Sequence, residues 1–143
     1  MLDVRLFPPE FRGNYPHMFP NDKEVWERFL NKYGNNYKGF YYDVICGEES
    51  ERFPHWKENY QKMARILSKL RIDAVGVKEN GVDIIEVKPR GNMAAVGQLL
   101  TYRKCYMEEY KPTGNVEAII VCKDIDPNII PVADANGIKY ITV

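Results

Sequence analysis

Two short runs rich in β-branched residues, separated by a turn signal, form the clearest pattern along the chain. Residues 71–77 read Arg-Ile-Asp-Ala-Val-Gly-Val and residues 82–88 read Val-Asp-Ile-Ile-Glu-Val-Lys, with Asn80-Gly81 just before the second run. β-Branched residues favour strands, and Asn-Gly favours a two-residue type I′ turn because both central residues of that turn need positive φ. The pattern therefore predicts a β-hairpin over residues 71–88 that turns at Asn80-Gly81.

Apolar residues that recur three and four positions apart predict helices around this hairpin. We expect the first helix over residues 22–33, with Asn21 and Glu24 as a capping box and Gly34 at its end. The other expected elements are helices over 54–70 and 93–110, strands over 37–46, 116–122 and 137–143, and a short helical segment that begins at Asp124.

The order of these elements predicts one α/β domain over residues 1–143, with a mixed central sheet flanked by helices. Residues 1–21 are rich in proline and aromatic residues, which predicts an irregular arm because proline fixes φ and removes a hydrogen-bond donor. The segment 89–92, Pro-Arg-Gly-Asn, is expected to end the second strand of the hairpin.

Asp73, Glu86 and Lys88 are the polar positions of the hairpin that suggest chemistry. Glu86 and Lys88 point to the same face of their strand, and a register with Asp73 near Glu86 would bring two carboxylates together. Two carboxylates, with the Val87 carbonyl as a further oxygen ligand, suit Mg²⁺ or Mn²⁺, and Lys88 would then hold or polarise a bound water. The alternative is an ion pair that only stabilises the sheet, although buried ion pairs stabilise less than apolar replacements.

The helix over 93–110 carries two further polar candidates. Gln98 and Tyr102 lie four residues apart, so they share one helical face and can turn toward the same end of the hairpin. Alternatively, Tyr102 packs in the core beside Leu99 and Tyr106.

This arrangement of residues resembles the PD-(D/E)xK nuclease superfamily, the restriction-endonuclease-like group. An aspartate on one strand, E-x-K on the next and Q-x-x-x-Y one helix later are similar to its RecB-type and archaeal NucS-type branches, and the same stretch is similar to small phage-type members. The resemblance implies an αβββαβ core and hydrolysis of DNA to a 5′-phosphate and a 3′-hydroxyl. It also implies metal binding by Asp73 and Glu86, support of the nucleophilic water by Lys88, and orientation of the substrate or the lysine by Gln98 and Tyr102.

Members of this superfamily often contribute a further glutamate from the first helix. Glu24 projects opposite the apolar stripe of that helix and Glu27 lies only somewhat closer to its edge, so we expect both to be solvated charges. A second E-x-K sequence, at residues 109–111, is expected at a helix end, where it needs no site.

The formal net charge is zero, so any attraction for nucleic acid must come from a local patch. Asn92 is expected to cap the helix over 93–110, whose first backbone amides, beside Arg90, suit a phosphate group. The candidate contacts to nucleic acid are Arg71, Arg90, Asn92 and Arg103.

Cysteine, histidine and hydropathy narrow the other possibilities. The three cysteines have no C-x-x-C spacing and are expected to be reduced thiols, and His17 and His55 lack the spaced partners of a zinc site. No apolar stretch approaches membrane-spanning length and the first residues do not form a signal pattern, so we expect a cytoplasmic protein, in the host cytoplasm if the source is a phage or virus.

The sequence therefore predicts a Mg²⁺- or Mn²⁺-dependent deoxyribonuclease. It leaves open whether ends or internal bonds are cut, and whether the DNA is duplex, single-stranded, flapped or mismatched. One alternative is an accessory or binding module that keeps the fold and holds nucleic acid without cutting it. Another is a subunit that cuts only as a homodimer or with a protein partner, because 143 residues offer little surface for target recognition.

Overall fold

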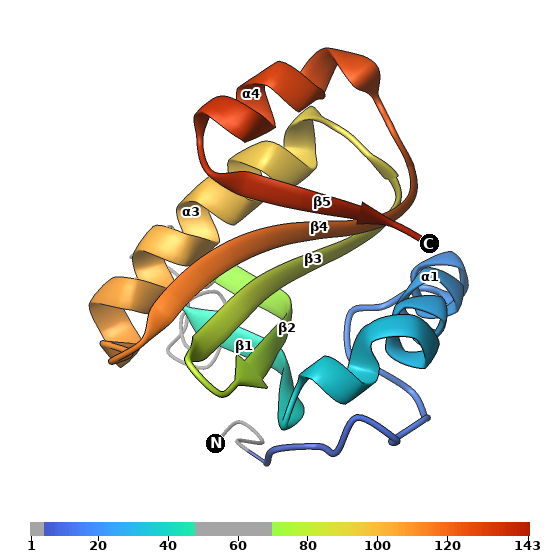
Figure 1. The fold of residues 1–143 in the computed structure, drawn as a ribbon, viewed down its shortest axis with the longest axis vertical. Coiled ribbons are helices and arrows are strands. Elements are labelled where there is room, and N and C mark those ends of the chain that lie inside the picture. Colours follow the sequence, from blue (N-terminus) through green and yellow to red (C-terminus); the bar gives the residue numbers. More distant parts are fainter. Residues whose placement is uncertain (1–4, 48–69) are drawn as a thin grey trace, which may run out of the picture.

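A five-stranded mixed sheet forms the centre of the protein (Figure 1). The computed structural model describes residues 5–47 and 70–143. The strands lie in chain order across the sheet; β2 is antiparallel to both β1 and β3, and β4 and β5 continue in parallel to β3. Their bounds are β1 Gly39–Cys46, β2 Leu70–Lys78, β3 Gly81–Gly91, β4 Asn115–Ile125 and β5 Ile138–Thr142.

Helices cover both faces of this sheet, which confirms the predicted α/β class (Figure 1). The helix α1 (Pro20–Tyr33) packs on one face, and α3 (Met93–Tyr110) with the short α4 (Ile130–Ala135) packs on the other. Two 3₁₀ turns, Gly34–Asn36 and Pro127–Ile129, follow α1 and precede α4. The expected helix over 54–70 lies outside the described residues except for Leu70, which instead begins β2.

Alternating side chains of the strands divide the core into two clusters. Ile84 and Ile120 pack with the α3 side chains Ala95 and Leu99 on one face of the sheet. On the other face, the neighbouring positions of the same strands pack with α1; these residues include Ile85, Val87, Ile119, Val121, Trp26 and Phe29.

The hairpin is present, but its turn differs from the predicted type. β2 and β3 pair from Ala74↔Ile85 to Lys78↔Gly81, so the two turn residues are Glu79 and Asn80, and neither has positive φ. Gly81 instead has φ 158°, and a Cβ there would overlap the carbonyl oxygen of Asn115. The glycine is therefore required by the close approach of β4, and the type I′ prediction is wrong.

The second hairpin strand continues beyond its predicted end. Pro89 was expected to end it, yet β3 runs to Gly91 because its partner there is β4, with Arg90 opposite Asp124. β2 pairs with β3 only as far as Ala74↔Ile85, so Pro89 has no partner on β2. The lack of an N–H in Pro89 therefore breaks no hydrogen bond of the hairpin. β4 likewise extends to Ile125, past the residue at which a helical segment was expected.

The first helix begins earlier than its predicted capping box. Pro20 is its first residue and Phe19 is the N-cap, and the backbone N–H of Phe19 donates to the Asp22 carboxylate at 3.0 Å. Proline suits the first helical position because its φ is already helical and that N–H has no partner in the helix. The Asn21–Glu24 capping box is therefore wrong, and Asp22 takes the role expected of Glu24.

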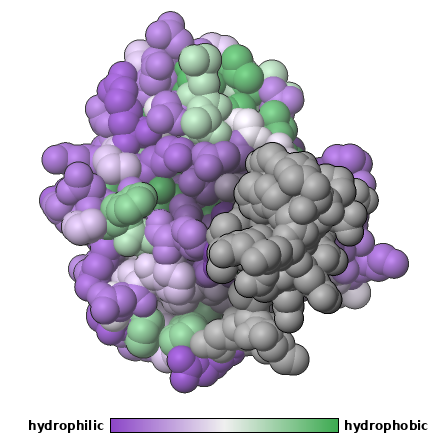
Figure 2. Space-filling model, turned by 180° about the vertical axis from the view of Figure 1, so that it is seen from behind, coloured by the Kyte–Doolittle hydropathy of each residue, from purple (hydrophilic) through white to green (hydrophobic). Residues whose placement is uncertain are grey.

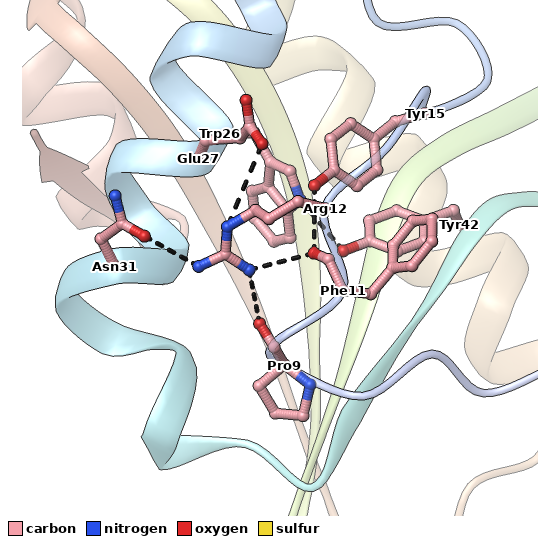
Figure 3. Close-up of polar contacts among 8 residues, drawn as sticks. All are labelled: Pro9, Phe11, Arg12, Tyr15, Trp26, Glu27, Asn31 and Tyr42. Atoms are coloured by element: carbon pink, nitrogen blue, oxygen red, sulfur yellow. Dashed lines mark hydrogen bonds and ion pairs between the residues drawn. The ribbon is translucent and has the colours of Figure 1, made fainter.

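The arm that precedes α1 is held to the body of the protein by a central arginine (Figure 3). The Arg12 guanidinium donates to the Pro9 carbonyl and to the Asn31 side chain of α1, both at 2.8 Å, and lies 4.0 Å from Glu27 of α1. A β-bridge joins Phe7 to Phe40 at the edge of the sheet, and Tyr15 is buried against the α1 side of the core. Residues 7–19 are irregular but fixed in place.

One face of the described residues is mostly polar (Figure 2). Figure 2 shows hydrophilic residues over much of one face, with hydrophobic residues in separate small areas outside the grey atoms. No helix in residues 5–47 or 70–143 is long and apolar enough to span a membrane.

Candidate active site

The candidate site lies at the fork where β2 and β3 separate. Their pairing ends at Ala74↔Ile85, and beyond this point β2 pairs only with β1. Continuing the register by one residue puts Asp73 opposite Glu86. Across the opening, the Asp73 carboxylate accepts a hydrogen bond of 2.9 Å from the backbone N–H of Val87. The separation of the two strands thus opens a polar cavity at this end of the hairpin.

Glu86 is the most unusual side chain in this fork. It is only 5% exposed, its Oε1 lies 3.5 Å from Lys88 Nζ, and its buried Oε2 has no hydrogen-bond donor among the described residues while both carboxyls are ionised; a proton on either group would be shared in a hydrogen bond between Glu86 and Asp73. Burial and the Asp73 carboxylate both raise the pKa of Glu86, and burial raises the pKa of Asp73. Two carboxyl groups so close together and so dry favour retention of a proton when no cation is present.

The helix α3 adds an amide and a phenol to the same cavity. Gln98 Nε2 donates to Tyr102 Oη at 3.4 Å, and Gln98 Oε1 is buried without a hydrogen-bond partner in the part of the chain that the structure describes. The Tyr102 ring packs in the core cluster with Leu99, and the residue also lines the pocket; burial raises the pKa of Tyr102, and the Glu86 carboxylate raises it further. Both interpretations of Tyr102 therefore hold: its ring is in the core and its hydroxyl lies in the cavity.

A pocket of about 700 Å³ surrounds these groups. Every site residue expected from the sequence lines it, except Arg103. The lining residues are His17, Phe19, Asp22, Leu70, Arg71, Asp73, Glu86, Val87, Lys88, Pro89, Arg90, Asn92, Gln98 and Tyr102.

The four candidates for contact with nucleic acid are placed differently. Asn92 caps α3 as predicted, with its Oδ1 accepting from the backbone N–H of Ala95 at 3.1 Å. At the rim, Arg71 binds Asp43 through two hydrogen bonds of 2.9 and 2.7 Å, and Arg90 binds Asp124 at 2.7 Å.

Arg103, the fourth candidate, lies outside the pocket. It lies one residue beyond Tyr102, about 100° further round the helix, and therefore points away from the fork. Its guanidinium donates to the backbone carbonyls of Asn136 and Gly137 after α4. It does not line the pocket, so the structure gives no support to Arg103 as a contact with nucleic acid at this site.

The acidic residue that α1 contributes to the pocket is Asp22, which the sequence analysis missed. Asp22 lines the pocket; burial is the main cause of the raised pKa of Asp73, and the charge of Asp22 raises it further. Glu24 pairs with Arg28 and Glu27 lies near Arg12, so both are outside the pocket, as expected. Pro20 was the signal that could have revealed this, since a helix that begins there puts Asp22 in its first turn.

A second feature that the sequence did not reveal is backbone strain at two residues beside the pocket. His17 and Asp43 have φ of 62° and 52°, and His17 Nε2 lies 3.5 Å from Asp43 Oδ1. Asp43 falls out of the β1–β2 pairing between Tyr42↔Ala74 and Val44↔Ile72. Positive φ in a residue other than glycine costs about 1–3 kcal/mol, so the surrounding structure holds both residues in these conformations.

The donor set of the fork fits a hard divalent cation. Two carboxylates, one with a buried and unpartnered oxygen, open onto a pocket with room for water. Mg²⁺ and Mn²⁺ accept few protein ligands and keep several waters. Within residues 5–47 and 70–143 no group of three or more His, Cys, Asp or Glu side chains converges, and the cysteines there are free thiols.

Comparisons with known proteins place this geometry in a wider context. No protein-family model and no curated protein sequence matches the chain. It does resemble the crystal structure of a repair endonuclease from Pyrococcus abyssi, with a TM-score of 0.52 and 18% identity over 92% of this chain and 49% of that one.

Two further solved structures give the same result. The EndoMS-dsDNA2 complex matches with a TM-score of 0.52 and 16% identity, covering 93% of this chain and 49% of that one. EndoMS in apo form matches with a TM-score of 0.52 and 15% identity, covering 92% and 48%. The chain thus spans about half the length of these proteins. Its mixed five-stranded sheet with helices on both faces has a restriction-endonuclease-like fold.

Proposed function

We propose that this protein is a Mg²⁺- or Mn²⁺-dependent nuclease that hydrolyses phosphodiester bonds in DNA. The observation that carries the proposal is the buried, unpartnered Oε2 of Glu86 beside the Asp73 carboxylate. An unsatisfied buried carboxylate oxygen destabilises the folded protein unless it binds a proton or a cation. The presence of such a group here therefore favours a functional role over a purely structural one.

Asp73 and Glu86 would hold the cation, with the Val87 carbonyl as a further ligand. When bound, the cation would polarise the scissile phosphate and lower the pKa of a water molecule. Asp73 already has its second oxygen fixed by the Val87 N–H, so the carboxylate is oriented before anything binds. This preorganisation favours a single geometry of the metal site.

Lys88 is well placed to position the attacking water. Its side chain is 22% exposed and lines the pocket, and its ammonium nitrogen lies 3.5 Å from the Glu86 carboxylate. Gln98 Oε1 is a buried acceptor that Lys88 or a water molecule could satisfy, and the Tyr102 hydroxyl orients the Gln98 amide. These two α3 residues are therefore proposed as positioning residues.

DNA as the substrate is supported by the rim of the pocket and by the structural neighbours. Arg71 and Arg90 flank the pocket, and the first backbone amides of α3 lie beside Arg90. One neighbour is a repair endonuclease, and another was solved with double-stranded DNA. These proteins suggest the class of substrate for this chain.

The test is cleavage of a panel of labelled single-stranded, duplex, flapped and mismatched DNA with Mn²⁺. Lys88→Ala should reduce the rate at least about 100-fold, the usual contribution of a group that moves or holds a proton. Lys32→Ala changes an exposed lysine at the end of α1 and serves as the matched control. Equal turnover by Lys88→Ala and wild type would contradict the role given to Lys88.

The same panel separates the non-catalytic alternative. DNA that is bound by the wild-type protein but not cut with either Mg²⁺ or Mn²⁺ would indicate a binding module that retains the fold. Rates that rise more steeply than the protein concentration would indicate that cutting requires self-association.

A further inference from the structure

We propose that Phe19 is a substrate-binding residue that stacks on an unpaired base next to the scissile phosphate. This inference rests on the proposed nuclease function and assigns the form of the nucleic acid at that site. It would make the protein selective for DNA that is single-stranded where it enters the pocket.

The position of Phe19 distinguishes it from other exposed apolar residues. Its side chain is 76% exposed, and among the described residues no aromatic side chain is more exposed. It lines the pocket that contains Asp73 and Glu86, whereas the exposed Tyr110 and Tyr140 do not. Single exposed apolar residues are common on protein surfaces, but here one lies at the mouth of the polar cavity.

The backbone of Phe19 is held rigidly. Its N–H donates to Asp22, and its carbonyl accepts the first helical hydrogen bond from Lys23 at 2.9 Å. Before it, Met18 donates to the Tyr15 carbonyl, and Tyr15 is 4% exposed. The arm and α1 therefore fix the backbone position from which the ring projects, so binding need order only the side chain itself.

Within residues 5–47 and 70–143, neither core cluster uses this ring. Phe19 belongs to neither core cluster, and its capping interaction is made by its backbone. A phenyl ring has no hydrogen-bonding atoms, so it cannot read the edge of a base. Stacking on the face of a base is the interaction open to it, and a free face exists only where the base is unpaired or unstacked.

Groups suited to a phosphate line the same pocket. His17 is two residues before Phe19, and its side chain is 49% exposed. Arg71 gives two of its five N–H donors to Asp43, which fixes the direction of its guanidinium group. A nucleotide at this rim would therefore meet an aromatic face for its base and positive or polar groups for its phosphate.

The charge of the chain also favours a short single-stranded contact over a long duplex contact. Affinity for duplex DNA comes largely from phosphate neutralisation, typically by about 6–10 contacts, whereas the formal net charge here is zero. Both rim arginines are already paired with aspartates. Stacking supplies binding energy that needs no excess of positive charge.

The test compares Phe19→Ala, Phe19→Leu and Phe19→Trp with wild type, and uses Tyr140→Ala, an exposed aromatic on β5, as the matched control. Cleavage with Mn²⁺ is measured on one labelled oligonucleotide as a single strand and as a full duplex. We expect Phe19→Ala to raise KM for the single strand about 5- to 150-fold, as for the loss of one base–aromatic stack, with little change in kcat. Phe19→Trp should restore KM, and Phe19→Leu should not.

Direct binding keeps this result separate from the failure of the nuclease proposal. Binding of the same proteins to the single strand is measured by fluorescence anisotropy under conditions in which no cleavage occurs. In a second measurement, 2-aminopurine is placed at each position of the strand in turn, and the quenching of its fluorescence reports stacking. If no protein cuts DNA but Phe19→Ala still weakens binding and removes the quenching, the nuclease proposal fails and the stacking role stands. If Phe19→Ala behaves like Tyr140→Ala in binding and cleavage, the stacking role is wrong.

Discussion

Replacing Glu86 by glutamine is expected to stabilise the metal-free protein and to abolish its stabilisation by Mn²⁺. Glu86 is 5% exposed, and burial and Asp73 raise its pKa above the ordinary value of 4.5. The folded protein therefore binds this proton more tightly than the unfolded chain does. Stability from this group is fully present below pH 4.5 and is lost as the pH rises through the raised folded-state pKa. Glutamine has nearly the same shape as glutamate and no charge, so the variant should not lose stability in this way as the pH rises.

The size of the effect follows from the pKa shift and from cation binding. Each unit by which the folded-state pKa exceeds the unfolded one destabilises the ionised protein by about 1.4 kcal/mol. We expect Glu86→Gln to gain about 1–3 kcal/mol at pH 8, which is a rise in Tm of roughly 3–12 °C for a domain of this size. In wild type, Mn²⁺ at 100 times its Kd should add about 2.7 kcal/mol, and the variant should lose this gain.

The assay is thermal unfolding at pH 5 and pH 8, with and without Mn²⁺. Glu24→Gln is the matched control, because it removes the same charge from an exposed residue of α1 outside the pocket. Without metal, Glu86→Gln should exceed wild type in Tm at pH 8 and approach it at pH 5. The reasoning is refuted if the variant is no more stable than wild type at pH 8, or if Mn²⁺ stabilises both proteins equally.

Three other outcomes are expected. The rate of cleavage should begin to fall at a pH well above 4.5 as the solution is acidified. The pKa values of the Asp73 and Glu86 carboxyls are raised, so protons compete with the cation for them in this range; a rate that stays constant down to pH 5 would contradict this. Tyr102→Phe should change Tm little, since the ring stays in the core, but should lower kcat about 10-fold or more through the lost hydroxyl; full activity would remove that hydroxyl from the site. Gly81→Ala should destabilise the protein by more than about 1 kcal/mol because the added Cβ would meet Asn115. Gly97→Ala should instead stabilise it by about 0.5–1 kcal/mol, since the space around Gly97 in α3 is open. Urea unfolding of the two variants tests this contrast.

The sequence alone determined the features that depend on neighbours along the chain. Alternation in the hairpin put Glu86 and Lys88 on one face, and a four-residue spacing put Gln98 and Tyr102 on one side of α3. The cap at Asn92 also followed from local chemistry. These patterns act over a few residues, so a single sequence reveals them.

Tertiary structure decided what lies around those residues. The fork exists because β2 leaves β3 to pair with β1, and β3 continues past Pro89 because β4 supports it. Asp22 and Phe19 reach the pocket because α1 begins at its proline and packs across the opposite face of the sheet, while Arg103 turns toward α4. Such contacts join segments far apart in the chain, and their geometry depends on how the layers pack, which no local pattern encodes.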